Sequence, residues 1–310
     1  MAAGDATAGS YVGKENVQSL PARRRFEPGL WIVYMLLTVG AITMTLPFVW
    51  MVSTSVKVDA DIFDVVPKWI PNQFDFANYS DAYQAIDMGR LFANTGFITV
   101  IDVAGQILLG AMAGYAFARL NFPGRRILFF SLLATMMVPF EVLIIPVFLF
   151  IRQFPLAGGN DIMGQGGIGL INSYGGVIFP NLISVFGIFL FRQFFQSFPH
   201  EIEEAGIIDG CSKSGIFWRI LMPNSKPVIG TLALFSFLWV WNDFLWPLVV
   251  VKNDSLNTLQ LGLSSFNQEV GTRWAELMAG SVMVSIPVLL LFFVLQRFLV
   301  QGLATTGLKG

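Results

Sequence analysis

Residue types needed for several common kinds of chemistry are scarce in this chain. It has one cysteine, Cys211, and one histidine, His200, among 310 residues. One cysteine cannot form an internal disulfide and one histidine cannot build a histidine-based metal site, so redox and metal chemistry are poor candidates. Charged residues make up only 13% of the chain and the net charge is −1. We therefore expect no nucleic-acid partner, because such proteins show a basic surface.

Motifs of nucleotide hydrolysis and of common membrane enzymes are missing as well. A phosphate-binding loop needs Gly, four residues, Gly-Lys and then Ser or Thr, but the nearest match, at Gly13-Lys14, has the wrong spacing and no hydroxyl. The chain contains no His-Glu-x-x-His motif, no Gly-x-Ser-x-Gly motif and no cysteine–histidine pairing. The sequence therefore predicts a protein that is not an enzyme and holds no cofactor or metal of its own.

Apolar residues are abundant. They make up 55% of the chain, with 30 Phe and 8 Trp, and the mean hydropathy is +0.65. No charged residue lies between Glu27 and Lys57, and about 20 apolar helical residues suffice to cross a bilayer. The same criterion predicts an all-α integral membrane protein with six transmembrane helices. They are expected at Gly29–Val52, Phe92–Phe117, Ile127–Phe150, Tyr174–Phe195, Val228–Val250 and Leu277–Leu299.

Basic residues indicate the orientation of these helices. Residues 1–28 are a polar tail, which we expect to be retained in the cytoplasm, and residues 29–310 form one membrane domain. With both termini in the cytoplasm, 13 of the 19 Lys and Arg residues lie on the inner side, as the positive-inside rule requires. They are Lys14, Arg23, Arg24, Arg25, Arg119, Arg125, Arg126, Arg192, Lys213, Arg219, Lys226, Arg297 and Lys309.

An external loop at residues 156–170, LAGGNDIMGQGGIGL, is polar and rich in glycine. It is expected to be an irregular surface segment. A flexible tether between two spans is the preferred interpretation, and contact with an external partner is the alternative.

The longest cytoplasmic loop, residues 199–227, has the features of a helix–turn–helix. Pro199 suits a first helical position, and the acids that follow it favour the helix dipole. Gly210 permits a sharp break, and Pro223 and Pro227 close the second helix.

Each helix of this loop has a distinct face. On the first, two small residues lie on one stripe, where another backbone can approach; the stripe comprises Ile202, Ala205, Gly206 and Asp209. On the second, an apolar ridge is expected to face the cytoplasm; it comprises Ile216, Phe217, Ile220 and Leu221. Such a ridge fits a groove on a partner, although amphipathic helices beside a membrane more often rest on lipid headgroups.

The same loop resembles the EAA loop of ABC importer permeases, whose pattern is Glu-Ala-Ala, three residues, Gly and a distal Leu-Pro. The matching positions are Glu204, Ala205, Gly206, Asp209, Gly210, Phe217, Ile220, Pro223 and Pro227. Gly206 stands in place of the second Ala, and Met222 in place of the Leu. The resemblance implies that these residues couple the chain to an ATPase.

Further segments are similar to carbohydrate-uptake permeases of the maltose-permease G type. They are the runs 191–195, 241–247 and 296–310, so the resemblance covers nearly the whole chain after residue 28. It implies a permease of a prokaryotic cytoplasmic membrane that imports a sugar or related solute. The implied partners are a second permease, two ATPase subunits that bind ATP and Mg²⁺, an external solute-binding protein and membrane lipid.

Two further regions are candidate sites. Asn242, Asp243 and Trp246 combine amide, carboxylate and aromatic groups, which suit a sugar path, and one continuous helix would place Asn242 and Trp246 on one face. For Trp241 and Trp246 the alternative is an interfacial aromatic belt. The tail from Gln301 and Gly302 is too polar to extend the last span. The family resemblance places it between the ATPases, and a frayed terminus is the alternative.

A different class of transporter would also explain a polytopic chain. In an ion-coupled carrier or a channel, the intramembrane acids Asp102, Glu141 and Asp243 would carry protons or ions. Pairing within the bundle, or a place at a helix end, is the preferred explanation for each acid. Carriers also commonly show repeated halves with broken helices, which the sequence does not reveal, and a carrier needs no ATPase-docking loop.

Overall fold

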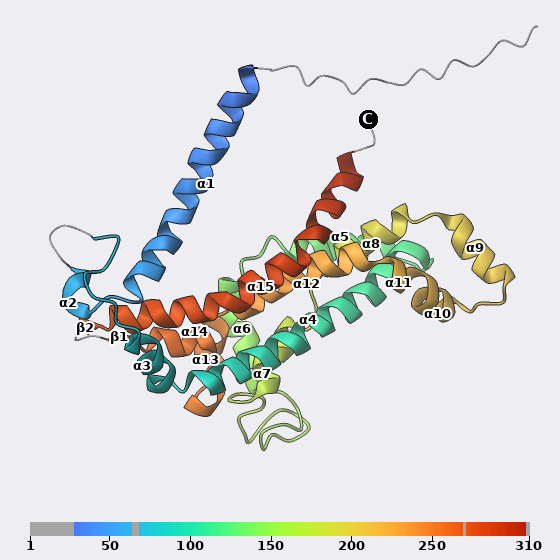
Figure 1. Ribbon diagram of the computed structural model, residues 1–310. Coiled ribbons are helices and arrows are strands. Elements are labelled where there is room, and N and C mark those ends of the chain that lie inside the picture. The colour runs from blue at the N-terminus through green and yellow to red at the C-terminus, as the bar shows by residue number, and fades with distance from the viewer. Residues whose placement is uncertain (1–27, 64–67, 269–270, 308–310) are drawn as a thin grey trace, which may run out of the picture. The chain divides into compact units, whose positions relative to one another are not determined.

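A computed structural model describes residues 28–63, 68–268 and 271–307. The chain divides into two units, Met1–Pro47 and Phe48–Gly310. The described part of the first unit is the N-terminal portion of helix α1, and all other elements belong to the second unit (Figure 1).

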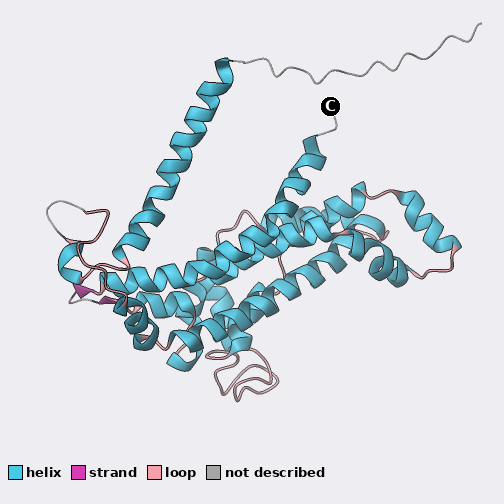
Figure 2. Ribbon diagram, in the orientation of Figure 1, coloured by secondary structure: helices cyan, strands magenta, loops and turns pink. Residues whose placement is uncertain are grey.

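Helices account for almost all of the regular structure (Figure 2). The α-helices are α1 Pro28–Thr54, α2 Asp59–Ile62, α3 Ala77–Ala85, α4 Met88–Arg119, α5 Arg125–Thr135, α6 Phe140–Arg152, α7 Tyr174–Ile178, α8 Val185–Ser197, α9 His200–Ile208, α10 Lys213–Ile216, α11 Met222–Asn224, α12 Lys226–Trp241, α13 Leu245–Val250, α14 Leu259–Ser264 and α15 Trp274–Gly307. Two 3-10 helices, η1 Phe179–Asn181 and η3 Asp254–Leu256, and a π-helix, η2 Phe217–Leu221, complete the helical elements of the described residues. The strands β1 Asn267–Gln268 and β2 Gly271–Thr272 pair antiparallel, with Asn267 opposite Thr272.

The prediction of an all-α membrane fold is confirmed, but only three of the expected spans are continuous helices. These are α1, α4 and α15, which contain uncharged or nearly uncharged windows long enough to cross a bilayer. The third and fourth expected spans are bent pairs, α5 with α6 at 106° and α7–η1 with α8 at 41°. The fifth is divided into α12, of 16 residues, and α13.

Local chemistry explains each break. Val138 precedes Pro139, and the residue before a proline disfavours helical backbone, so α5 and α6 separate there. Ser184 accepts a hydrogen bond from the Gly187 amide (3.1 Å) and starts α8 as a new helix. Asp243 similarly accepts from the Trp246 amide (3.3 Å) at the start of α13. Hydropathy alone does not register these caps.

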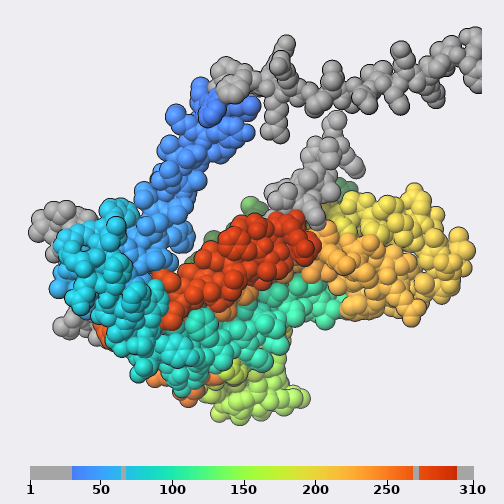
Figure 3. All heavy atoms as spheres, in the orientation of Figure 1, coloured from blue at the N-terminus to red at the C-terminus, as the bar shows by residue number. Residues whose placement is uncertain are grey.

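The second unit is organised around α4, which packs against α8 and α12, while α15 packs against α12. In the space-filling view, α15 (red) and α4 (teal) lie along the visible face (Figure 3). Near the N-terminal end of α4, the Asn94 amide donates to the carbonyls of Ser255 and Asn257, both at 2.9 Å. The Tyr174 hydroxyl donates to the Asn94 carbonyl oxygen at 2.7 Å. These bonds fix the connection between α13 and α14 to α4. The other end of α4 lies beside α9 and α10 (Figure 1).

Candidate functional site

Residues 199–227 form the expected helix–turn–helix, called here the hairpin. Helix α9 ends at Ile208, and Gly210 turns the chain with a φ of +80°. The Ser212 hydroxyl then accepts from the Gly215 amide (3.2 Å) and starts α10, which continues through the π-helix η2 into α11. A π-helical turn is rare, and such turns occur frequently at functional sites.

The apolar ridge of the second helix faces the protein, so its predicted exposure to the cytoplasm is wrong. Ile216, Phe217 and Leu221 are buried in one cluster with Phe191 and Phe195 of α8. The reason is that α4, α8 and α12 together offer an apolar face, and covering it removes more apolar surface from water than an exposed ridge would. The ridge therefore attaches the hairpin to its own chain.

The small residue Gly206 also has an internal role. A side chain at this position would come within 2.8 Å of the Ile220 Cδ1 atom. Gly206 is buried, whereas Ala205 on the same predicted stripe is exposed. The predicted stripe therefore does not form one contact surface. Gly206 faces η2 and allows α9 to approach it, whereas Ala205 faces away from η2.

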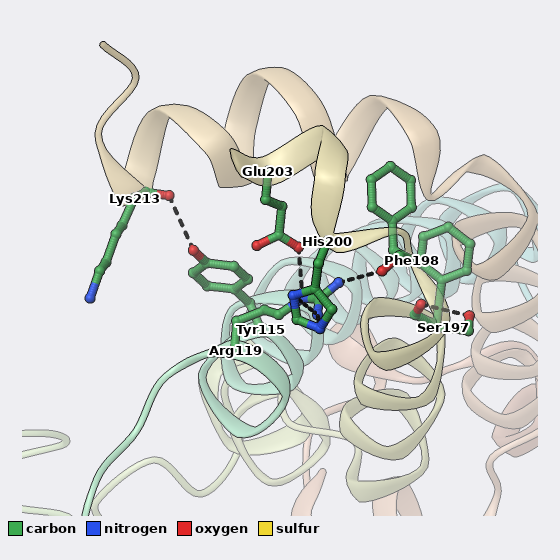
Figure 4. Close-up of polar contacts among 8 residues, drawn as sticks. Tyr115, Arg119, Ser197, Phe198, His200, Glu203 and Lys213 are labelled. Atoms are coloured by element: carbon green, nitrogen blue, oxygen red, sulfur yellow. Dashed lines mark hydrogen bonds and ion pairs between the residues drawn. The ribbon is translucent and has the colours of Figure 1, made fainter. Parts of the chain in front are cut away.

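One buried ion pair joins the hairpin to the end of α4 (Figure 4). The Arg119 Nε atom lies 2.7 Å from the Glu203 carboxylate, and their side chains are only 5% and 12% exposed. Arg119 also donates from Nη2 to the Phe198 carbonyl (2.6 Å) and from Nη1 to the His200 ring (2.6 Å to Nε2). Nearby, the Tyr115 hydroxyl donates to the Lys213 carbonyl (3.4 Å). Both helices of the hairpin are therefore bound to α4.

The outer face of the hairpin carries the remaining matched residues. Glu204, Ala205, Asp209, Gly210 and Pro223 are exposed, and Ile220 is half-buried. Three large apolar side chains that the motif did not single out are also exposed there: Ile207 (60%), Ile208 (85%) and Trp218 (51%). A groove of about 560 Å³ follows the turn, lined by residues that include Asp209, Ser212, Trp218 and Arg219. In the sequence, the adjacent Ile207 and Ile208 directly follow Glu204-Ala205-Gly206, and this apolar pair could have predicted the exposed face.

The break after α12 changes the geometry expected for the tentative solute path. Asn242 and Trp246 do not share a helical face, because Asn242 is the C-cap residue that follows α12 and Trp246 lies in α13. Trp246 is fully buried, and its indole donates to the Gly176 carbonyl (3.1 Å). Trp241 is also buried, and its indole donates to the Val284 carbonyl (3.2 Å). Neither an aromatic belt nor a sugar-stacking face therefore describes these two tryptophans.

The polar groups beside the break are more accessible. Asn242 is exposed, donates to the Leu238 carbonyl (2.8 Å) and accepts from the Gln260 amide (3.3 Å). Asp243 is half-buried and bonds to the Trp246 amide. Asn242 and Asp243 thus keep the accessibility that a solute path needs, which Trp246 lacks.

The other intramembrane acids occupy different surroundings. Glu141 is exposed in the first turn of α6, where an acid favours the helix dipole. Asp102 is fully buried in α4, and its carboxylate has no hydrogen-bond partner among the described residues. The three broken spans overturn the expectation of unbroken helices, so this feature no longer separates the chain from ion-coupled carriers.

The C-terminal tail is helical, in contrast to the prediction. Helix α15 continues through Gln301 and Gly302 to Gly307, and 308–310 lie outside the described residues. The sequence from residue 299 onward lacks proline, and an isolated glycine only weakens a helix that is already formed.

The glycine-rich loop, residues 156–170, contains no helix or strand, as expected of an irregular segment, but hydrogen bonds join its parts to one another. The Asn160 amide donates to the carbonyls of Arg152 (2.8 Å) and Phe154 (3.1 Å) and accepts from the Gly167 amide (2.8 Å). The Asp161 carboxylate accepts from the amides of Met163 and Gln165. These bonds fix a compact loop on which Leu156, Ile162 and Met163 are exposed.

Known proteins share both the sequence and the fold. A family model described as the binding-protein-dependent transport system inner membrane component matches residues 106–305. The arabinooligosaccharides transport system permease protein AraQ of Halalkalibacterium halodurans is 35% identical, over 71% of this chain and 74% of its own length. The diacetylchitobiose uptake system permease protein DasC of Streptomyces coelicolor is 31% identical, over 87% of this chain and 93% of its own.

A solved structure supports the fold. One chain in the crystal structure of a bacterial ABC transporter involved in the import of the acidic polysaccharide alginate superposes with a TM-score of 0.75. The identity is 24%, and the superposition covers 90% of this chain and 99% of that one. The family match includes α8, the entire hairpin and the break after α12.

Proposed function

Because the chain belongs to the family of binding-protein-dependent transport system inner membrane components, we propose that it imports a sugar or related solute together with a second, non-identical permease. The chain is a membrane permease subunit and not an enzyme, and ATP is hydrolysed on a partner subunit. The names of the relatives AraQ and DasC support an oligosaccharide as the solute.

The complete assembly in this proposal has two ATPase subunits that bind ATP and Mg²⁺ and an external solute-binding protein. Both termini lie in the cytoplasm, which the distribution of Lys and Arg supports. The hairpin then lies on the same side as the ATPases and receives one of them.

The observation that carries this assignment is the different placement of two adjacent acids. Glu203 points inward and is neutralised by Arg119, whereas Glu204 is exposed beside Ile207 and Ile208. A surface with a central apolar pair and charged neighbours is suited to bind another protein. The internal attachment makes the hairpin move with α4 when the ATPases close, which tilts the helices between inward-facing and outward-facing states. Coupling is reciprocal, so solute delivery also acts on the ATPases.

The variant Glu204→Lys tests the docking surface in the assembled transporter. Reversing the charge on the outer face should reduce solute-stimulated ATP hydrolysis and uptake by roughly tenfold, the effect of losing one interfacial contact. Asp81→Lys on the exposed face of α3 makes the same charge change elsewhere and should have no effect. If the Glu204→Lys variant inserts normally and keeps full solute-stimulated ATP hydrolysis and uptake, the docking assignment is refuted.

Two further regions belong to the proposal. We place Asn242 and Asp243 on the solute path, so Asn242→Ala and Asp243→Asn should alter uptake without impairing assembly.

The end of α15, including Gln301 and Gly302, contacts the ATPases. Deleting Ala304–Gly310 should then lower the coupling of ATP hydrolysis to solute uptake without lowering the insertion of the chain into the membrane. Unchanged transport would favour a frayed terminus.

A further inference from the structure

Three arginines gather where α5 begins, and they are called here the arginine cluster. Arg125 and Arg126 belong to the first turn of α5, and Arg192 belongs to the last two turns of α8. The guanidinium carbon of Arg192 lies 3.9 Å from the centroid of the Phe129 ring, so this side chain reaches across from α8 to the second turn of α5. The Arg126 guanidinium lies 5.8 Å from the centroid of the Phe130 ring. Two helices therefore bring three positive charges to one place.

No acidic residue compensates the charge of this cluster. None of its arginines pairs with a carboxylate of the described residues, and the sequence has no Asp or Glu between Asp102 and Glu141. Arg125 donates to the Leu120 carbonyl (2.8 Å), which is a neutral acceptor. The Nε atom of Arg192 is buried and has no hydrogen-bond partner in the described part of the chain. Because a buried donor without an acceptor is unfavourable, an acceptor from outside the chain is expected.

The direction of α5 adds to the need for an anion. The start of a helix carries partial positive charge from its free amides, so acidic side chains are favoured there and basic ones are not. Arg125 and Arg126 nevertheless occupy this turn, and the N-cap residue Gly124 has no side chain that could accept from the amides. An anion beside this turn would be attracted by the guanidinium groups and by the helix together.

The surface next to the cluster is apolar. Ile127, Leu128 and Phe130 of α5 are 73%, 52% and 57% exposed. Helices α5 and α6 together form one of the bent membrane spans, so the cluster lies at the end of a span and the apolar strip continues along it. A phospholipid has the same order of groups, with a charged phosphate above hydrocarbon chains. A soluble anion would leave the apolar strip unused.

We propose that the arginine cluster binds the phosphate of an anionic phospholipid of the cytoplasmic leaflet, such as phosphatidylglycerol, with its acyl chains along α5. Guanidinium groups pair with phosphate through two parallel hydrogen bonds, which suits arginine better than lysine. Basic pockets between membrane helices on the cytoplasmic side bind such headgroups. The choice of leaflet rests on the orientation in the proposed function, whereas binding of the lipid does not depend on which solute is imported.

Native mass spectrometry of the complete transporter tests this site. The probe is dioleoylphosphatidylglycerol, and dioleoylphosphatidylcholine, which has no net charge, is the comparison. The double variant Arg125→Gln/Arg192→Gln should bind the anionic lipid roughly 25-fold more weakly, because each basic residue near an anionic headgroup contributes about fivefold. Binding of phosphatidylcholine should not change.

Two single variants make the measurement specific. Arg126→Gln changes an exposed side chain, so it keeps the test decisive if the double variant fails to assemble, and it should lower the affinity for phosphatidylglycerol by about fivefold. The control Arg297→Gln removes an arginine that also lies over an aromatic ring, 4.9 Å from the centroid of Phe298. Arg297 has no other Lys or Arg within ten residues, so this variant should keep the wild-type affinity.

Three results would overturn the inference. Equal binding of phosphatidylglycerol by the wild type and by the variants of the cluster would show that another group, such as an acid of a partner subunit, neutralises the arginines. Equal affinity of the wild type for the two lipids would exclude recognition of the anionic headgroup. Glycerophosphoglycerol, the headgroup without acyl chains, should not compete, and strong competition would indicate a site for soluble anions. Each result leaves the import function intact, because lipid binding is measured without transport.

Discussion

The hairpin and the glycine-rich loop are two connections between helices of the second unit, and they keep their shapes by different means. The hairpin is held by side chains, through the Arg119–Glu203 ion pair and the buried Ile216, Phe217 and Leu221. The glycine-rich loop is held mainly by its backbone, because its amides and carbonyls bond to one another and to the side chains of Asn160 and Asp161.

This difference determines what each connection can do. Side-chain packing onto three helices makes the hairpin part of the helical body, which suits a surface that transmits force. The glycine-rich loop is bonded to itself and to the end of α6, through the carbonyls of Ile151 and Arg152, and it presents the exposed side chains of Leu156, Ile162 and Met163. Substitutions should therefore affect the loop through backbone space and the hairpin through side-chain contacts.

Replacing one glycine in each connection should give the largest contrast. Gly169→Ala places a methyl group against the Ile151 carbonyl oxygen at a positive φ, so we expect a loss of more than about 3 kcal/mol in the free energy of unfolding. Gly210→Ala has the same φ restriction but open space around the methyl group, so we expect a loss of about 1 kcal/mol in the free energy of unfolding. Titration with sodium dodecyl sulfate would measure both. Equal losses would contradict the distinction.

Breaking the ion pair should have an intermediate effect on the hairpin. Arg119→Gln leaves Glu203 buried without its partner and should lower the free energy of unfolding by roughly 3 kcal/mol. In a double-mutant cycle, Glu203→Gln should recover part of this loss, whereas Glu204→Gln should add independently because Glu204 is exposed. The same unfolding titration reports both cycles. An additive Arg119–Glu203 cycle would remove the ion pair from the explanation of hairpin attachment.

Helix caps should give the smallest effects, and equal ones. Ser212 caps α10 in the hairpin, and Ser173 caps α7 just after the glycine-rich loop, each accepting one amide hydrogen bond. Replacement of either by Ala should cost about 1 kcal/mol, since capping is local and independent of how the connection is attached. A much larger loss for Ser173→Ala would show that the loop depends on this side chain as well.

The sequence predicted those features that depend on local chemistry. Pro199, the acids of α9 and Gly210 correctly located the helix–turn–helix, and long apolar runs located α1, α4 and α15. Which side of the hairpin is buried was not predictable, because both faces carry apolar residues and only the neighbouring helices decide between them.

Features that depend on distant contacts were missed for related reasons. Mean hydropathy does not register the Ser184 cap or the hydrogen bond from the Trp246 amide to Asp243, so the divided spans appeared continuous. The irregular character of the glycine-rich loop was predicted, but its internal contacts depend on which carbonyls each glycine approaches, and composition does not encode that. The paired strands at 267–272 are too short for a periodic signal. Hydrogen bonds join Gln106 to Asn181 and to Ser236, which come from three separate segments.

Helix α4 has a mechanical consequence that follows from its length. Its 32 residues span about 48 Å at 1.5 Å per residue, longer than the hydrocarbon core. Arg119 fixes one end to the hairpin, and Asn94 fixes the region near the other end to residues 255 and 257. A stiff rod held in this way acts as a lever, because a tilt of about 10° about one end displaces the other by roughly 8 Å. A small rotation of the hairpin would therefore become a large displacement of the connection between α13 and α14.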